Sequence, residues 1–377
     1  MASRLTDDNN ASSVAPMSRV LVAMSGGVDS SVAAARLVRA GHEVIGATLH
    51  LWDYPDDGSA LGRCCAPEDI HDARRVADVL GIPHYAFDHT ELFRRRIVEP
   101  FIDAYLLGTT PSPCVECNRS IKVQALLRLA DRFGADRVAT GHYARIVEEG
   151  GIPQLHRGRD RRKDQSYFLH TLGPDVLRRL ELPLGESTKE EVRSEAASLE
   201  LPGAGKGESQ ELCFVPSGRY DEIVEREAAE RIRPGNIVDS AGNVVGRHAG
   251  VHRYTVGQRR NLGIAVGHRA YVVAVEAETA TVRLGSDDAL LATRAVLTDA
   301  TLAPDVALPL ECEVAVRYRG SCHFATVAAA PGPLDAALEV RFRDPVRAVV
   351  PGQFAVFYEA DRVLGGGRIC SADAEGA

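Results

Sequence analysis

Short apolar runs alternate with amphipathic stretches in the first half of the chain. Runs rich in branched aliphatic residues are typical of buried strands, and we expect strands at residues 19–24, 42–51, 84–88 and 136–142. The stretches between them place apolar residues at helical spacing and end at glycines, which predicts helices over residues 32–40, 69–80 and 118–133. Strands separated by helices form parallel sheets, so the pattern predicts a doubly wound α/β domain with its ligand at the carboxyl ends of the strands.

The periodicity changes at the glycine-rich stretch of residues 201–210, which we expect to be a linker or mobile loop. Beyond about residue 230 no long helical period continues, and short strand-like runs with turn signals follow Pro234. We therefore predict four segments: a disordered tail (1–17), the α/β domain (18–205), a small β-rich domain that begins with the mobile loop (206–290), and a C-terminal β-barrel (291–370).

The composition narrows the class of protein. The chain has 377 residues, of which 45% are hydrophobic, and no apolar stretch approaches the ~18 residues that cross a bilayer. The first residues lack the apolar core of a secretory signal, so we expect a cytoplasmic protein without membrane contact whose eight cysteines are mostly reduced. The net charge of −8 argues against adhesion to nucleic acid over the whole surface but permits a local basic patch.

Residues 23–31, AMSGGVDSS, form the expected corner between the first strand and the first helix. Glycines let backbone N–H groups approach an anion closely, and a helix N-terminus favours negative charge. Ser25, Ser30 and Ser31 add hydroxyl donors, and Asp29 is suited to help hold a magnesium ion that bridges phosphates. The corner therefore suits a pyrophosphate, although a capped helix start with a Gly-Gly turn is the plainer interpretation.

Cysteines provide a second candidate chemistry. Cys114 and Cys117 form a C-x-x-C, which is redox-active, metal-binding or incidental, and no second such pair suggests structural zinc. Cys117 directly precedes Asn118, the expected N-cap of a helix, and a thiol there has a lowered pKa and nucleophilic character. Cys213 follows the glycine-rich loop, which could move it. The remaining cysteines have a core role or no assigned role: Cys312, Cys322, Cys370, Cys64 and Cys65.

A basic run, HRGRDRRK, occupies residues 156–163. Such a run is commonly a solvated face, but its arginines also suit contacts with the phosphates of a nucleic acid.

Several motifs together carry a family resemblance. The corner segment SGGVDSS resembles the PP-loop of ATP pyrophosphatases, which cleave ATP between the α and β phosphates. TPSPCVECN, ATGHYAR, KDQSYFL, ESQELCF, YTVGQRRNLGI, VRYRG and PGQFAVFY follow in order. Together they resemble the tRNA-specific 2-thiouridylases over roughly residues 18–370. The resemblance implies ATP-dependent 2-thiolation of uridine at the anticodon wobble position, by adenylation of the C2 oxygen and sulfur transfer, giving 2-thiouridine, AMP and pyrophosphate.

The resemblance also implies roles for individual residues. Cys213 carries a persulfide, Cys117 is its partner nucleophile, and a disulfide between them closes the cycle. ATP, with Mg²⁺ held through its phosphates and Asp29, is expected to contact Ala23, Met24, Ser25, Gly26, Gly27, Val28, Asp29, Ser30, Leu49 and Gly141. The target base is expected to meet Ser112, Pro113 and Cys114. Other tRNA contacts are expected at His142, Lys163, Asp164, Gln165, Arg317, Tyr318 and Gln353.

Three alternatives remain open at this point. Some members of the family carry Asp in place of Cys114, and three cysteines here, Cys114, Cys117 and Cys213, suffice to hold a [4Fe–4S] cluster that delivers sulfide. A PP-loop synthetase acting on a small molecule and a non-catalytic RNA- or iron–sulfur-binding protein are the others. The expected partners are tRNA with a wobble uridine and a persulfide or sulfide donor protein, with a monomeric enzyme. The sequence identifies neither the donor nor the set of tRNAs.

Overall fold

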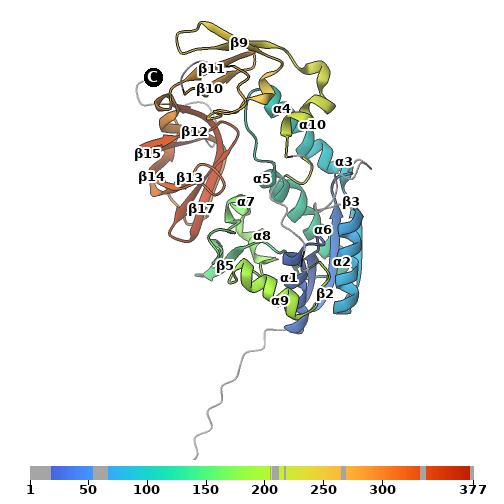
Figure 1. The fold of residues 1–377 in the computed structure, drawn as a ribbon. Helices are drawn as coiled ribbons and strands as arrows, with labels where there is room; N and C mark the ends of the chain where they lie inside the picture. The colour runs from blue at the N-terminus through green and yellow to red at the C-terminus, as the bar shows by residue number, and fades with distance from the viewer. Residues whose placement is uncertain are drawn as a thin grey trace, which may run out of the picture.

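The computed structural model describes residues 18–53, 67–203, 205, 212–215, 218–264, 269–331 and 337–373. Three bodies are visible in Figure 1: an α/β domain that begins at the N-terminus, a small β domain, and a barrel that ends at the C-terminus. Within the described residues, no helix is both long enough and apolar enough to span a bilayer.

The first domain is built on a parallel sheet with strand order β3-β2-β1-β4-β7. The strands are β1 (Arg19–Ala23), β2 (Glu43–His50), β3 (His84–Asp88), β4 (Arg137–Ala139) and β7 (Leu180–Glu181). Val20 and Val22 of β1 pack in one apolar cluster with α1 (Val28–Arg39), α2 (Pro67–Leu80) and α9 (Lys189–Ser198). Leu21 points to the opposite face and a second cluster. The predicted doubly wound domain is confirmed.

The second face of the sheet is covered by two long helical segments that each contain a π-helical turn. One runs through α3 (Thr90–Phe93), a π-turn (Arg94–Val98) and α4 (Glu99–Leu106). The other runs through α5 (Pro113–Cys117), a π-turn (Asn118–Lys122) and α6 (Val123–Phe133), and ends at Gly134 in the left-handed conformation. Such π-turns widen a helix locally and are frequent at functional sites.

A small β domain follows α10 (Tyr220–Glu227). Its strands are β8 (Gly235–Val238), β9 (Val244–His248), β10 (Tyr271–Glu276) and β11 (Thr281–Gly285), in the order β10-β11-β8-β9. Ile237, Val272 and Val282 are fully buried in its own apolar core.

The C-terminal strands close into an antiparallel barrel, as predicted. They are β12 (Leu291–Leu302), β13 (Leu310–Ala315), β14 (Cys322–Ala329), β15 (Leu338–Arg347), β16 (Phe354–Glu359) and β17 (Arg362–Asp373). Pairing of β12 with β17 closes the barrel. The hairpin of β5 (Ala144–Glu149) and β6 (Ile152–Arg157) was not predicted; it leaves the α/β domain and pairs with β17 at one position, His156 with Arg362.

The remaining α-helices of the described residues are α7 (Ser166–Leu169) and α8 (Pro174–Arg178), and short 3₁₀ helices occur at Ala229–Arg231, Val251–Arg253 and Asp288–Leu290. The α7 helix joins the first domain to the barrel, because the Tyr167 hydroxyl donates to the carbonyl of Phe354 at 2.9 Å.

Candidate active site

The glycine-rich corner lies between β1 and α1, at the carboxyl edge of the parallel sheet. Gly26 has φ +72°, and a Cβ there would stand 2.4 Å from the carbonyl oxygen of Asp69, so only glycine fits without a shift. Gly27 is the N-cap of α1, and within the described residues no side chain caps it. The first-turn N–H groups of a twelve-residue helix therefore face the corner, as a phosphate site requires.

Hydroxyls and a neighbouring turn complete this corner. Ser30 and Ser31 donate to the carbonyl of Gly27 at 2.9 and 3.1 Å, and the N–H of Ser25 donates to Ser30 Oγ at 3.1 Å. A Cβ on Gly141 would lie 2.9 Å from the backbone nitrogen of Ser30, so the turn after β4 packs directly on the start of α1. The structure thus brings together the corner and Gly141, which the sequence places more than a hundred residues apart.

An ion pair missed by the sequence reasoning lies at the same corner. Lys189 Nζ donates to both carboxylate oxygens of Asp29, at 2.7 Å each, and the Tyr143 hydroxyl donates to Asp29 Oδ1 at 2.7 Å. Lys189 is the first residue of α9, whose start is fixed by a capping box between Thr188 and Glu191. The capping-box residues could have been recognised in the sequence, and they would have placed Lys189 at a helix start. They could not have shown that Lys189 lies beside Asp29.

Magnesium has a limited set of protein ligands here. Asp29 is the carboxylate at the corner, and its two oxygens already accept hydrogen bonds from Lys189 and Tyr143. Among the described residues no group of three His, Cys, Asp or Glu side chains is arranged to hold a metal ion. Mg²⁺ commonly takes one carboxylate and fills its shell with phosphates and water, so the residues fit an ion that arrives with ATP.

Leu49 is the second-to-last residue of β2. It is buried in the apolar cluster between the sheet and α6. Met24 and β2 are tied together, because Thr48 Oγ1 donates to the carbonyl of Met24 at 2.6 Å. The expected contact of Leu49 with adenine is untested by this packing and stays a prediction.

The helix with the two clustered cysteines begins earlier than the sequence predicted. Pro113 is its first residue, Ser112 is the N-cap, and the segment continues through Cys117 into α6. Asn118 is therefore not an N-cap: it is buried inside the helical segment and its Nδ2 donates to the carbonyl of Cys114 at 3.0 Å. The N-cap assignment was wrong because Asn uses the same side-chain chemistry to bond a carbonyl four residues back.

The thiolate inference for Cys117 fails with that assignment. Cys117 is buried, and burial raises the pKa of its thiol to about 11, although the nearby Lys122 acts in the opposite direction. In this conformation Cys117 is a protonated thiol at neutral pH.

Cys213 follows the glycine-rich stretch of residues 201–210. Residue 204 and residues 206–211 lie outside the described residues. Phe214, the neighbour of Cys213, is fully buried between the rings of Phe93 and Phe101, with edge-on centroid distances of 5.7 and 5.0 Å. In this structure Cys114, Cys117 and Cys213 are not joined in disulfides. Among the described residues no trio of His, Cys, Asp or Glu side chains is arranged to hold a metal ion, and the [4Fe–4S] alternative stays a hypothesis.

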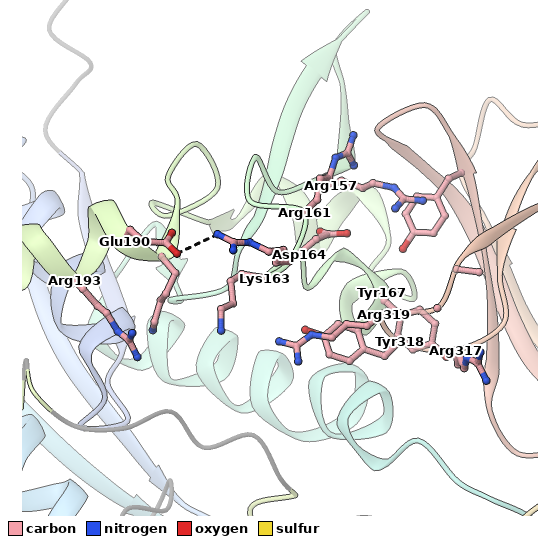
Figure 2. Close-up of a pocket in the computed structure, with 15 residues that line it drawn as sticks. Arg157, Arg161, Lys163, Asp164, Tyr167, Glu190, Arg193, Arg317, Tyr318 and Arg319 are labelled. Atoms are coloured by element: carbon pink, nitrogen blue, oxygen red, sulfur yellow. Dashed lines mark hydrogen bonds and ion pairs between the residues drawn. The ribbon is translucent and has the colours of Figure 1, made fainter. Parts of the chain in front are cut away.

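A basic cavity of about 790 Å³ opens beside this corner. Figure 2 shows its side chains coming from the 157–164 loop, from α9 and from the barrel loop that carries Arg317, Tyr318 and Arg319. Of the described residues that line it, eight are Lys or Arg and two are acidic, in contrast to the net charge of −8 of the chain. Lys189 belongs to this lining, so the cavity adjoins the phosphate corner.

Comparison with known proteins identifies the chain's relatives. The model described as "tRNA methyl transferase HUP domain" matches residues 18–217, "tRNA methyl transferase PRC-barrel domain" matches 222–286, and "Aminomethyltransferase beta-barrel domain" matches 288–369. A protein of Sorangium cellulosum called tRNA-specific 2-thiouridylase MnmA is 59% identical, over 94% of this chain and 92% of its own. Proteins with that name from Geobacter metallireducens (95% and 98% covered) and Chloroflexus aggregans (94% and 98%) are 50% and 51% identical.

The chain belongs to the tRNA-specific 2-thiouridylase family. The resemblance inferred from the motifs is thereby confirmed. Its family-implied tRNA positions fall in two groups. Lys163, Asp164, Arg317 and Tyr318 line the basic cavity. Gln165, His142 and Gln353 are not among the described residues that line it.

Two of the expected tRNA-contacting side chains make hydrogen bonds within the protein itself. Asp164 accepts from the N–H groups of Gly158 and Ser166, at 3.0 and 3.1 Å, and the side chain of Gln165 accepts from the N–H of Tyr143 at 3.0 Å. These bonds shape the loop that presents Lys163. Contacts of Asp164 and Gln165 with RNA stay predictions.

His142 is another such position. Its Nδ1 lies 2.8 Å from the Thr140 hydroxyl, and burial lowers the pKa of the imidazole to about 3. The ring is therefore neutral at physiological pH, so any RNA contact would be through a hydrogen bond and not through charge.

The basic run is more heavily paired than its charge suggests. Arg159, Arg161 and Arg162 form ion pairs with Glu191, Asp361 and Glu190, the last drawn as a dashed line in Figure 2. Arg157 lies 3.6 Å from the ring centre of Tyr358 and donates to Cys322 Sγ.

Cys312 is a buried barrel residue, as expected, whereas Cys370 is exposed, which corrects its assignment to the core. Cys64 and Cys65 lie outside the described residues.

Proposed function

We propose that this chain catalyses ATP-dependent 2-thiolation of the wobble uridine in tRNA, with Cys117 and Cys213 transferring the sulfur. Membership of the 2-thiouridylase family supports the reaction class, and one structural observation carries the assignment. The phosphate corner and the basic cavity share Lys189, so an ATP-activating site directly adjoins a surface fit for RNA phosphates.

The first step is adenylation of the base. The C2 oxygen of uridine attacks the α-phosphorus of ATP, and pyrophosphate leaves. The first-turn N–H groups of α1 and the ammonium of Lys189 would stabilise the charge that develops on the departing pyrophosphate. To do so, Lys189 must exchange its contact with Asp29 for a phosphate oxygen. Mg²⁺, carried by the phosphates and Asp29, supplies further charge neutralisation when bound.

The second step is sulfur transfer. The terminal sulfur of a persulfide on Cys213 attacks C2 of the adenylated base, and AMP leaves with the former C2 oxygen. The thiolate of Cys117 then attacks the Cys213 sulfur, which breaks the S–S bond, releases 2-thiouridine and forms a Cys117–Cys213 disulfide. An external reductant, a thiol, restores both cysteines before a sulfur donor reloads Cys213.

This chemistry requires a change in the surroundings of Cys117. A thiol with a pKa of about 11 supplies little thiolate at neutral pH. Lys122, whose charge already lowers that pKa, lies in the π-turn that follows Cys117. We infer that binding of tRNA and ATP brings Cys117 out of its apolar setting and next to Cys213.

The names of two matching family models refer to a methyl transferase, but the site favours thiolation. The corner offers donors for a leaving pyrophosphate, and the cysteines offer a carrier and a nucleophile for sulfur. The proposed partners are tRNA and a persulfide donor protein. A monomeric enzyme in the cytoplasm stays our expectation.

The test is a reconstituted reaction with unmodified tRNA bearing a wobble uridine, ATP, Mg²⁺ and a persulfide source. We expect AMP and pyrophosphate to form only when tRNA is present, and mass spectrometry of the digested tRNA to find 2-thiouridine. Formation of AMP without tRNA would favour a synthetase of small molecules. A methylated nucleoside formed in place of the thiolated one would contradict the sulfur chemistry.

A further inference from the structure

The segment that leads into the cysteine helix is held by the barrel. The loop between β15 and β16 carries Pro351, Gly352 and Gln353. The N–H of Thr110 donates to the carbonyl of Pro351 at 3.0 Å, and Gln353 Nε2 donates to the carbonyls of Thr110 and Pro111 at 3.0 and 3.2 Å. Three backbone groups immediately before α5 are therefore satisfied by one barrel loop.

The fit of this loop leaves no room for adjustment. Gly352 has φ +93°, and a Cβ there would lie 2.8 Å from the carbonyl oxygen of Thr110. On its other side the loop is fixed to β17 by two backbone hydrogen bonds. The N–H of Gly352 donates to the carbonyl of Ile369 at 2.9 Å, and the N–H of Ile369 donates to the backbone carbonyl of Gln353 at 2.8 Å. The loop is thus a rigid part of the closed barrel.

A second contact joins the barrel to the cysteine helix itself. Arg368 of β17 donates to Glu116 at 2.7 Å, and Glu116 lies between Cys114 and Cys117 in α5. Its other carboxylate oxygen accepts from Arg119 at 2.8 Å, in the π-turn. Arg368 is oriented by Asp299 of β12 at 3.2 Å. Ionised pairs with this geometry are stronger and more directional than neutral hydrogen bonds.

We propose that the barrel positions the cysteine helix, with Gln353 and Arg368 as positioning residues that set where Cys114 and Cys117 lie. This inference rests on the proposed role of Cys117 in thiolation. Gln353 positions the cysteine helix through its hydrogen bonds to the carbonyls of Thr110 and Pro111, and this role is separate from any contact with RNA. Because Tyr318 belongs to the same rigid barrel, RNA that engages Tyr318 acts on the cysteine helix through these two contacts.

Alkylation of Cys117 tests the positioning without requiring activity. Full-length protein without tRNA is treated with iodoacetamide, and the modification rate at Cys117 is followed by mass spectrometry. Removal of one or two hydrogen bonds in Gln353→Leu or Arg368→Gln should favour local opening by ~10-fold and raise that rate equally. Arg368→Lys keeps the charge and should restore most of the protection. An unchanged rate in both variants overturns the proposal.

Kinetics separate positioning from RNA binding. In Arg368→Gln we expect tRNA affinity and tRNA-dependent release of pyrophosphate to stay within ~2-fold, while 2-thiouridine formed per AMP falls ~10-fold. Arg347→Gln is the matched control, since Arg347 at the end of β15 forms an ion pair with Asp287 just before the barrel and away from the cysteine helix. It should change neither readout. Thiolation per AMP that stays unchanged in both Gln353→Leu and Arg368→Gln, whatever the tRNA affinity, would overturn the inference. Parent protein that makes no 2-thiouridine would instead defeat the proposed function and leave the alkylation test valid.

Discussion

We predict that the two partners of the Lys189–Asp29 ion pair at the phosphate corner contribute unequally to stability when each is replaced alone. The side chain of Lys189 is only 5% exposed, whereas that of Asp29 is 34% exposed and keeps a hydrogen bond from Tyr143. Asp29→Asn therefore takes the Asp29 charge away from a buried ammonium, while Lys189→Met leaves a carboxylate that water can reach. The two substitutions break the same contact but leave groups with very different solvation.

The magnitudes follow from the burial. Removal of one partner of a buried pair costs ~3–5 kcal/mol when the remaining charge is buried. We expect roughly 3 kcal/mol for Asp29→Asn, and roughly 1 kcal/mol for Lys189→Met because solvent compensates the exposed carboxylate. The double variant should be more stable than Asp29→Asn, with a coupling energy of about 2 kcal/mol.

Hydrogen exchange of the amides in α1 and α9 is the appropriate assay, because it reports local opening in a protein of several domains. Activity gives a second readout. Lys189→Met should lose about 100-fold in tRNA-dependent AMP formation, as expected for removal of a charge-stabilising donor. Equal stability losses in the two single variants, or strictly additive effects in the double variant, would refute the reasoning.

Three further predictions concern other parts of the site. Burial raises the pKa of Cys117 to about 11, so its alkylation in the tRNA-free enzyme should rise about tenfold per pH unit from pH 7 to pH 10, and a plateau at pH 8 would contradict this. Lys163→Ala together with Arg317→Ala should reduce the slope of log affinity for tRNA against log salt by about 1.4, since each released counterion contributes about 0.7 for single strands. Gly26→Ala should abolish AMP formation, because its Cβ would meet backbone at 2.4 Å, whereas Gly41→Ala, with φ +85° and open space around its Cβ, should cost only about 1 kcal/mol and retain activity.

The α/β domain could be predicted because its signals are local. The strands and helices of the first domain show their period along the chain, and glycines mark the helix ends. The phosphate corner was equally local, because Gly26, Gly27 and the hydroxyls all lie within one turn.

The rest of the site depends on packing that no local pattern encodes. A lysine at a helix start is ordinarily solvated, and Lys189 is buried only because α9 packs on α1, where Arg36 pairs with Glu195 at 2.6 Å. The burial of Cys117 is likewise a property of the surrounding cluster. The start of the helix that carries Cys117 could have been predicted from Ser112-Pro113, since proline favours the first helical position. The polar residue Asn118 was instead taken as the N-cap.

The β5–β6 hairpin changes where the chain can be divided. The turn residue Asp361, between β16 and β17, accepts from Arg145 at 2.5 Å and from Arg161, and its carbonyl accepts from the N–H of Arg157 at 2.8 Å. The hairpin belongs to the first domain by sequence but to the barrel by contact. A chimaera that exchanges barrels between relatives at residue 290 would separate these partners. The functional module for such an exchange comprises residues 144–157 together with the barrel strands.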